Sequence, residues 1–247
     1  MDSAPKTWFD SKEIIEIRNK VQKPWHQEEY FAWFFIRRYS IYISLLISRY
    51  TQITPNQLTV LGILFGVASG LSFSFGTKES LIIGVIFYFI TYTLDCVDGE
   101  VARLKNMKSK SGAWFDLGLR YSLYFTFFSA STIILRDNHI LNEGVISHII
   151  VFCILVSILS TEGTRLELEK VNIAQTMTSI RKKNKLIDSF VSILATEPGY
   201  YIALIIMVLF EVGTLIEIWA LFHVIIFIIK SLLRYFLTIR RLNKTNW

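Results

Sequence analysis

The stretch LIIGVIFYFITYTL at residues 81–94 is followed directly by DCVDGEVAR at residues 95–103. A helix over the apolar part rises only about 21 Å at about 1.5 Å per residue, less than the roughly 30 Å hydrocarbon core of a bilayer. Asp95 and Asp98 therefore begin before the hydrocarbon ends, where carboxylates need partners and often mark function. The transition predicts a membrane helix with an acidic site at one end.

The two carboxylates lie on one face of this helix, because positions 95, 98 and 102 come round together at helical spacing. Ala102 adds only a methyl group to that face. Gly99 leaves room for a ligand or another backbone to approach closely. We therefore expect the two carboxylates to converge on one point.

A second predicted helix supplies a third carboxylate. It begins with Gly112, carries Asp116 one turn further and Arg120 one turn deeper, so that these positions form a single stripe. The short loop over residues 104–111 predicts that the two helices are antiparallel neighbours. Asp116 can then face the first two carboxylates.

Three carboxylates in a region of low dielectric constant repel one another unless they are protonated or neutralised by cations. Oxygen donors favour Mg²⁺ or Mn²⁺, which commonly keep bonds to phosphate oxygens. The cluster therefore points to phosphoryl chemistry. Acids at helix ends are often merely solvated or paired with Lys and Arg, but the combined spacing favours a site.

The composition agrees with a bilayer environment. Of the 247 residues, 52% are hydrophobic, and the mean hydropathy is +0.43, which leaves too little polar surface for a fold exposed to water. The net charge of +6 would suit nucleic acid in a soluble protein, but basic residues between apolar spans are better explained as topology signals. Cys96 and Cys153 lie in apolar runs without the spacing of a disulfide framework or a thiolate metal site.

We predict an all-α polytopic membrane protein with six transmembrane helices preceded by an interfacial amphipathic helix. A cytoplasmic segment over residues 1–52 precedes a membrane domain over residues 53–247, and the predicted spans are about 56–75, 80–103, 112–135, 144–165, 199–213 and 214–239. The last two spans run together around Gly213, so five spans are the alternative.

The basic residues predict the orientation of this domain. They gather in the N-terminal segment, between spans two and three, between spans four and five, and at the C-terminal end, whereas the opposite side would receive only Lys78 and Arg136. The positive-inside rule then places both termini and the acidic site on the cytoplasmic side.

Residues 29–50 combine aromatic and aliphatic side chains with Arg37, Arg38 and Arg49. This mixture is typical of a helix at the cytoplasmic interface, with its arginines on lipid phosphates. Two roles are open for it. It either clamps the bundle or guides lipid to the site.

The acidic motif resembles a family signature. CDP-alcohol phosphotransferases carry D-x2-D-G-x2-A-R-x8-G-x3-D-x3-D, and the corresponding run here is Asp95-x2-Asp98-Gly99-x2-Ala102-Arg103-x8-Gly112-x3-Asp116. The motif is long and specific, and the predicted topology extends the resemblance over nearly the whole chain. Residues 54–59 are also similar to the family segment that enters the first span, although Thr54 and Pro55 equally suit a plain helix start.

The resemblance implies that an acceptor alcohol attacks the phosphorus of a CDP-linked donor and that CMP leaves, in the synthesis of phospholipids or related headgroups. It implies two Mg²⁺ or Mn²⁺ ions, with Asp95, Asp98 and Asp116 as metal ligands, and a homodimer. The donor is expected to be CDP-diacylglycerol or a similar CDP-alcohol. The nucleotide pocket would be formed by Asn56, Thr59, Asp95, Gly99, Ala102, Arg103 and Gly112.

The sequence departs from the signature at its fourth aspartate, where it has Arg120. That aspartate is a ligand of the second metal and the expected general base, and arginine can serve as neither because it has no acceptor and stays protonated. Three explanations are open: another base such as Glu162 or His223; a CDP-binding homologue of impaired activity, with Arg120 paired to Asp116; or an arginine that replaces one metal electrostatically.

The acceptor is open as well, although Arg165, Lys170 and Arg181 would suit an anionic one. Intramembrane prenyltransferases also use aspartates and Mg²⁺, but on two separated motifs. A transporter with an acidic ion pathway is the non-enzymatic alternative, and it would commonly show repeated halves.

Overall fold

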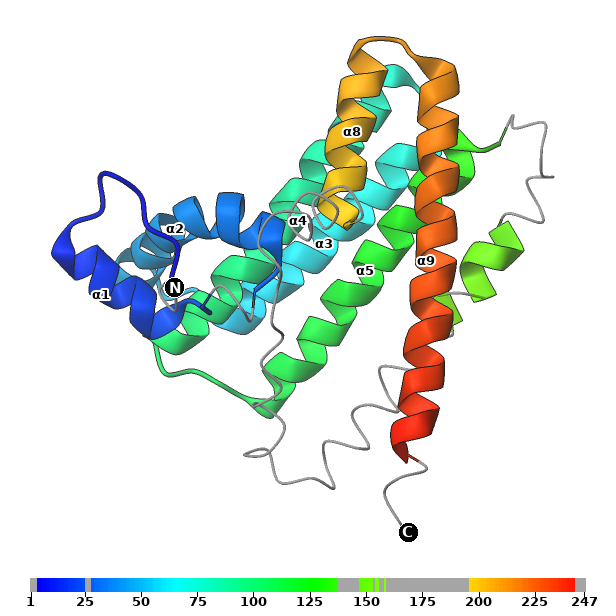
Figure 1. Ribbon diagram of the computed structural model, residues 1–247. Helices are drawn as coiled ribbons and strands as arrows, with labels where there is room; N and C mark the ends of the chain where they lie inside the picture. Colours follow the sequence, from blue (N-terminus) through cyan, green and yellow to red (C-terminus); the bar gives the residue numbers. More distant parts are fainter. Residues whose placement is uncertain are drawn as a thin grey trace.

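A computed structural model of the chain describes residues 4–24, 28–136, 147–152, 154–155, 158 and 196–242. Within these ranges every regular element is a helix (Figure 1), which confirms the all-α prediction. The elements are α1 (Lys12–Val21), η2 (Ala32–Ile36, a π-helix), α2 (Arg37–Tyr50), α3 (Pro55–Ser74), α4 (Lys78–Leu104), α5 (Lys110–Ile134), α8 (Glu197–Leu209) and α9 (Gly213–Leu242).

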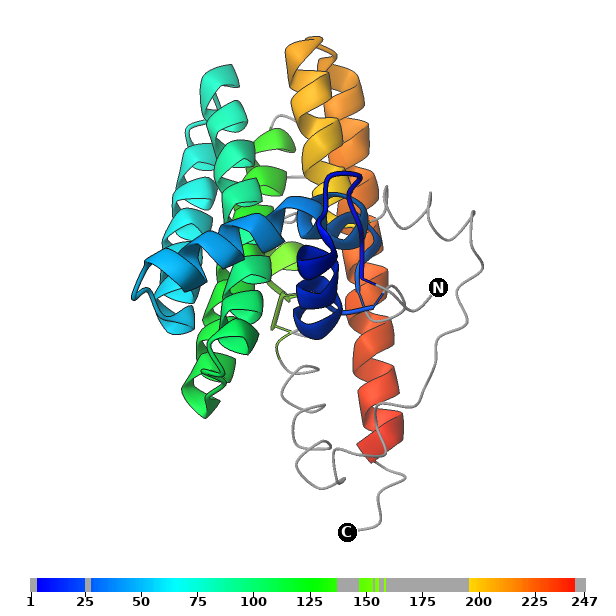
Figure 2. The same ribbon diagram turned by 90° about the vertical axis from the view of Figure 1, so that its left-hand side faces the viewer.

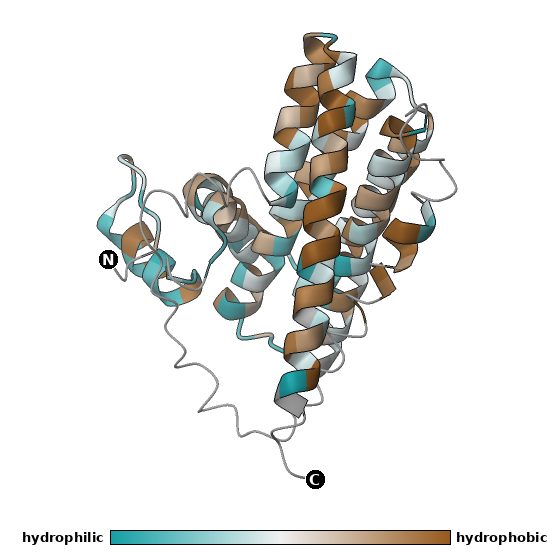
Figure 3. Ribbon diagram, turned by 45° about the vertical axis from the view of Figure 1, so that its right-hand side comes forward, coloured by the Kyte–Doolittle hydropathy of each residue, from teal (hydrophilic) through white to brown (hydrophobic). Residues whose placement is uncertain are grey.

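Three described helices, α3, α4 and α9, are long and apolar enough to cross a membrane. Figure 3 shows α9 as a largely hydrophobic helix with few hydrophilic interruptions. Helix α5 has 25 residues but is not among the three, and α8 is apolar but has only 13 residues. The structure thus supports an integral membrane protein and matches the six-span prediction only in part.

The structure describes the fifth and sixth predicted spans more fully than the fourth. The fourth predicted span, 144–165, falls largely outside the described residues, although residues 147–152 are helical. The last two spans are separate helices in the structure. The chain turns between α8 and α9 at Glu211, whose φ of 58° is left-handed.

Helix α3 packs along both α4 and α5 through a stripe of small residues. Gly62, Gly66 and Gly70 recur every four residues on one face of α3. A Cβ atom on Gly66 would lie 2.3 Å from the Oγ of Ser122, and one on Gly70 would lie 2.4 Å from the ring of Phe125. Small residues allow membrane helices to approach closely, and here they bring α3 against α5.

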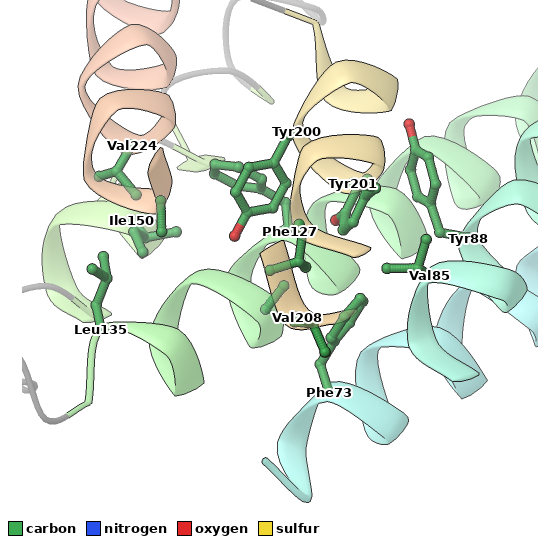
Figure 4. Packing of buried hydrophobic residues seen from close by; sticks show 13 residues of the cluster. Phe73, Val85, Tyr88, Phe127, Leu135, Ile150, Tyr200, Tyr201, Val208 and Val224 are labelled. Atoms are coloured by element: carbon green, nitrogen blue, oxygen red, sulfur yellow. The ribbon is translucent and has the colours of Figure 1, made fainter. Parts of the chain in front are cut away.

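An aromatic cluster joins these helices to α8 and α9 (Figure 4). The rings of Tyr88 and Tyr201 lie 3.9 Å apart between centroids, and Phe127 lies 5.5 Å from Tyr200. Offset and edge-to-face pairs of this kind add to the free energy gained by burial. The cluster holds the ends of the helices that lie away from the acidic motif.

The N-terminal segment lies across α4 (Figure 2). Helix α2 turns a polar face inward, where Ser40 and Ser44 are fully buried. Arg37 is only 5% exposed and forms an ion pair with Glu100 of α4. The prediction that Arg37 binds lipid phosphates is therefore wrong, because an internal carboxylate holds its guanidinium.

Candidate active site

The start of α3 supplies the first part of the site. Thr54 caps the helix in a reciprocal capping box with Gln57, and Pro55 is its first residue, so the predicted helix start is confirmed. Thr59 is buried one turn later, and its hydroxyl lies 2.6 Å from Asp98 Oδ2 as a hydrogen-bond donor. The predicted site residue Thr59 thus contacts the acidic motif directly.

The acidic end of α4 supplies the second part. Asp95 and Asp98 are both half-buried. Their charges act on each other and on Asp116 of α5. The helices therefore bring the three predicted carboxylates within electrostatic reach of one another, as the antiparallel arrangement of the second and third spans requires.

The turn into α5 fixes the third part. Ser109 caps α5 by accepting a hydrogen bond from the N–H of Gly112 at 3.0 Å. A Cβ atom on Gly112 would lie 3.3 Å from Oδ1 of Asn56, whose amide nitrogen is 3.3 Å from Ser111 Oγ. The predicted residues Asn56 and Gly112 therefore lie side by side where α3 and α5 both begin.

Arg120 lies on α5 with its Nη2 atom 3.5 Å from Oδ2 of Asp116. The predicted ion pair is therefore confirmed. Their side chains are 44% and 52% exposed respectively, and pairs as exposed as this contribute about 0–1 kcal/mol. The pair is thus weak enough for a ligand or metal ion to displace it.

Arg103 points toward the N-terminal segment. Its Nε donates a hydrogen bond to the carbonyl of Val21, and its guanidinium covers Gly99, where a Cβ atom would lie 3.3 Å from Nη2. Ala102, half-buried in the same turn, accepts a hydrogen bond at its carbonyl from the N–H of Met107 at 2.9 Å. Arg103 thus links the motif to the segment before the bundle.

Glu100 is the residue of the motif that the sequence argument missed. It is fully buried and forms an ion pair with Arg37. In the sequence, Glu100 was recognisable only as a further carboxylate of the motif helix, on the side away from Asp98. Arg37 and Lys23 also act electrostatically on Asp95, so the N-terminal segment belongs to the surroundings of the site.

A cavity of about 310 Å³ lies between α4, α5, α8 and α9. Tyr92 of α4 precedes Asp95, and Tyr124 of α5 follows Arg120, and both line this cavity. Its polar lining also includes side chains from α8 and α9 and from the N-terminal segment, namely Glu29, Thr196, Glu197, Lys230 and Ser231. Polar groups from several parts of the chain thus border this cavity, although none of the three carboxylates of the site lines it.

Within the described ranges, no three His, Cys, Asp or Glu side chains stand close enough to form a ready-made metal site. The donor set still suits a hard divalent cation, because it consists of oxygens that repel one another, with Asp98 oriented by Thr59. Of the suggested alternative bases, His223 packs against Trp219 and Tyr200. Glu162 and the basic residues Arg165, Lys170 and Arg181 lie outside the described residues.

Comparison with known proteins agrees with this geometry. The model of the family described as CDP-alcohol phosphatidyltransferase matches residues 52–226. The chain is 40% identical over 98 residues to a bifunctional IPC transferase and DIPP synthase of Aquifex aeolicus, covering 39% of this chain and 22% of that protein. It is 39% identical over 80 residues to a protein of the same name from Thermococcus kodakarensis, covering 32% and 17%. The chain thus matches about a fifth of the length of these relatives, and it belongs to the CDP-alcohol phosphatidyltransferase family.

Proposed function

We propose that this protein transfers a substituted phosphate group from a CDP-linked donor to an acceptor alcohol and releases CMP. The observation that carries the proposal is the contact of Thr59 on α3 with Asp98 on α4, in a chain of this family whose Asp95 and Asp116 lie within electrostatic reach of Asp98. Mutually repelling carboxylates need a cation, and a diphosphate needs the same cation to neutralise its charge.

Asp95, Asp98 and Asp116 would hold the Mg²⁺ or Mn²⁺ ion, which when bound would neutralise charge on the diphosphate. Thr59 fixes the orientation of Asp98 by donating to one oxygen, which leaves the other oxygen for the metal. Asn56 and Gly112 lie side by side at the starts of α3 and α5. They suit the predicted nucleotide contact.

Arg120 sets the expected level of activity. Its pairing with Asp116 favours a protein that binds CDP compounds and turns over slowly, because one metal ligand is partly engaged and the expected base is missing. With donor phosphates bound, the guanidinium can instead stabilise negative charge on them. A second metal ion is not part of the proposal.

The acceptor would occupy the cavity that Tyr92 and Tyr124 line. Its tyrosines and carboxylates, such as Tyr92 and Glu29, present groups that pair with hydroxyls, and the hydroxyl of Tyr92 already donates to Glu29 at 2.6 Å. These groups would bind the hydroxyls of the acceptor. The relatives' names include a transferase and a synthase activity, which agrees with a group-transfer reaction.

The outer face of α2 supports a membrane-embedded donor. Leu46 and Tyr50 are 59% and 80% exposed, whereas Ser40 and Ser44 are buried. This reversal of the usual pattern suits a helix that faces lipid, and it favours CDP-diacylglycerol or a similar amphiphile. The proposal also places both termini and the site on the cytoplasmic side. It divides the chain into an N-terminal segment up to residue 52 and a membrane domain from residue 53, and it includes a homodimer.

The test is CMP release by the purified full chain in nanodiscs, with CDP-diacylglycerol, Mn²⁺ or Mg²⁺ and a panel of alcohols. We expect slow, metal-dependent and alcohol-dependent release that an Asp98→Asn variant loses. The matched control is Asp10→Asn, an acidic residue outside the site. Absence of both CMP release and CDP binding by calorimetry would reject the proposal and favour transport.

A further inference from the structure

Glu100 is a fully buried carboxylate that is held by four side chains of the N-terminal segment. Its Oε1 atom accepts hydrogen bonds from Gln22 at 2.9 Å, Arg37 at 2.9 Å and Ser40 at 2.7 Å. Its Oε2 atom accepts one from Ser44 at 2.7 Å. Buried charges are expensive unless they are paired and fully hydrogen-bonded, so this carboxylate ties α4 firmly to α1 and α2.

Arg37 connects the same carboxylate to the backbone of the acidic motif. Its Nη1 atom donates both to Glu100 and to the carbonyl of Cys96, 2.9 Å away in each case. Cys96 lies between the two acidic residues Asp95 and Asp98. The other side of the guanidinium is fixed by Glu28, which accepts hydrogen bonds from it at 2.8 Å.

The anchor and the acids lie on different sides of α4. Two residues along an α-helix differ in direction by about 200°, so Glu100 points nearly opposite to Asp98. Asp98 is held from α3 by Thr59, and Glu100 is held from α2. A rotation of this turn about the axis of α4 would break both sets of contacts.

We propose that Glu100 and Arg37 form a positioning pair that sets the rotation of the acidic turn of α4, so that the N-terminal segment controls how well Asp95 and Asp98 bind a divalent cation. The inference rests on the proposed function for its cation. A positioning role differs from a purely stabilising one in a measurable way. A contact that only stabilises the fold changes the unfolding temperature but leaves the cation affinity of the folded protein unchanged.

The native thiol of Cys96 reports on this packing. Cys96 is 2% exposed and packs against Phe31, Ala32 and Ile36. In a Cys153→Ser background it is the single thiol of the chain, so its rate of maleimide labelling measures how often the N-terminal segment separates from α4 at η2. A titration with Mn²⁺ alone, followed by electron paramagnetic resonance in detergent, measures how tightly the acidic site binds a divalent cation.

Three variants separate the possibilities. Glu100→Gln removes the charge at constant size, and Ser44→Ala removes one hydrogen bond as a milder change. Glu13→Gln is the matched control, because it makes the same change in a carboxylate of the N-terminal segment that is 70% exposed and pairs with Arg49, outside α4. All variants are compared below their unfolding temperatures.

We expect Glu100→Gln to raise the labelling rate and to weaken Mn²⁺ binding by about 10-fold or more, as loss of outer partners of metal ligands does elsewhere. Ser44→Ala should act in the same direction by about 3-fold, and Glu13→Gln should change neither quantity. Unchanged labelling and affinity in a folded Glu100→Gln protein, or equal effects of Glu13→Gln, would overturn the inference. If the unchanged chain binds no Mn²⁺, the proposed metal site fails, and control of α4 by Glu100 is still judged by the labelling rates.

Discussion

The guanidinium of Arg120 lies 3.5 Å from the carboxylate of Asp116, one turn away on the same helix. One of the three carboxylates of the site therefore has a positive partner within the chain. Relative to an aspartate, an arginine at this position adds two units of positive charge, which opposes a second cation nearby. The identity of residue 120 thus bears on both metal binding and proton transfer.

Replacing Arg120 with aspartate should raise CMP release by about 10²–10⁴-fold, the usual contribution of a positioned general base. Arg120→Gln is the control, because it frees Asp116 without adding a base or a carboxylate. We expect little activity from this control and a second bound Mn²⁺ only in the aspartate variant. Equal CMP release by the unchanged chain and Arg120→Asp would mean that another residue acts as the base.

Thr59→Val tests whether Asp98 needs its hydroxyl partner. The change keeps the shape of the side chain but leaves Asp98 Oδ2 without the donor at 2.6 Å, so we expect Mn²⁺ affinity to fall by about 10-fold. Thr91→Val is the matched control, since Thr91 donates to the backbone carbonyls of Gly62 and Phe87. Both variants should lose about 1 kcal/mol of stability. Equal Mn²⁺ affinities in the two proteins would contradict a role for Thr59 in the site.

Local spacing was sufficient to predict the helices that carry the candidate site and one ion pair within it. The apolar run before Asp95 located α4, the residues Thr54 and Pro55 located the start of α3, and the four-residue spacing of Asp116 and Arg120 predicted their ion pair. In each case the interacting groups lie within about one helical turn, where geometry follows from the helix itself.

The contacts that the sequence argument missed join distant parts of the chain. Glu100 and Arg37 are 63 residues apart, and a basic residue in an aromatic segment suits lipid phosphate as well as an internal carboxylate. The close approach of Gly66 to Ser122 likewise depends on how α3 and α5 pack. Periodicity identifies the faces of a helix but does not determine which face meets which partner.

Gly66→Ala should destabilise the protein by about 1–3 kcal/mol, the usual cost of overpacking. The new methyl group would lie 2.3 Å from Ser122 Oγ, so α3 and α5 must separate. Gly213→Ala is the control, because a Cβ atom there would meet no other segment within 4 Å in the part of the chain that the structure describes. Thermal unfolding in detergent measures both, and Ser122→Ala combined with Gly66→Ala should recover part of the loss. A Gly66→Ala protein as stable as the control would show that the helices do not approach this closely.

The carboxylate of Asp10 should make the stability of the protein depend on pH in the acid range. Burial favours the neutral acid, but the N–H of Thr7, the hydroxyls of Tyr42 and Thr7 and the guanidinium of Arg18 outweigh it and hold the pKa of Asp10 well below its usual value. Because the native pKa is lowered, the stabilisation is fully present above about pH 4, the ordinary pKa of an aspartate. It is lost as the pH falls from there toward the native pKa.

We therefore expect the unchanged protein to exceed Asp10→Asn in stability by about 2 kcal/mol near neutral pH, the range for hydrogen bonds to a charged group. This difference should stay constant down to about pH 5 and shrink below about pH 4, where the unfolded chain takes up a proton that the folded chain resists. Thermal unfolding of both proteins in detergent at a series of pH values measures it. A difference that grows as the pH falls would mean that Asp10 is protonated in the folded protein and that its contact with Arg18 does not hold the N-terminal segment.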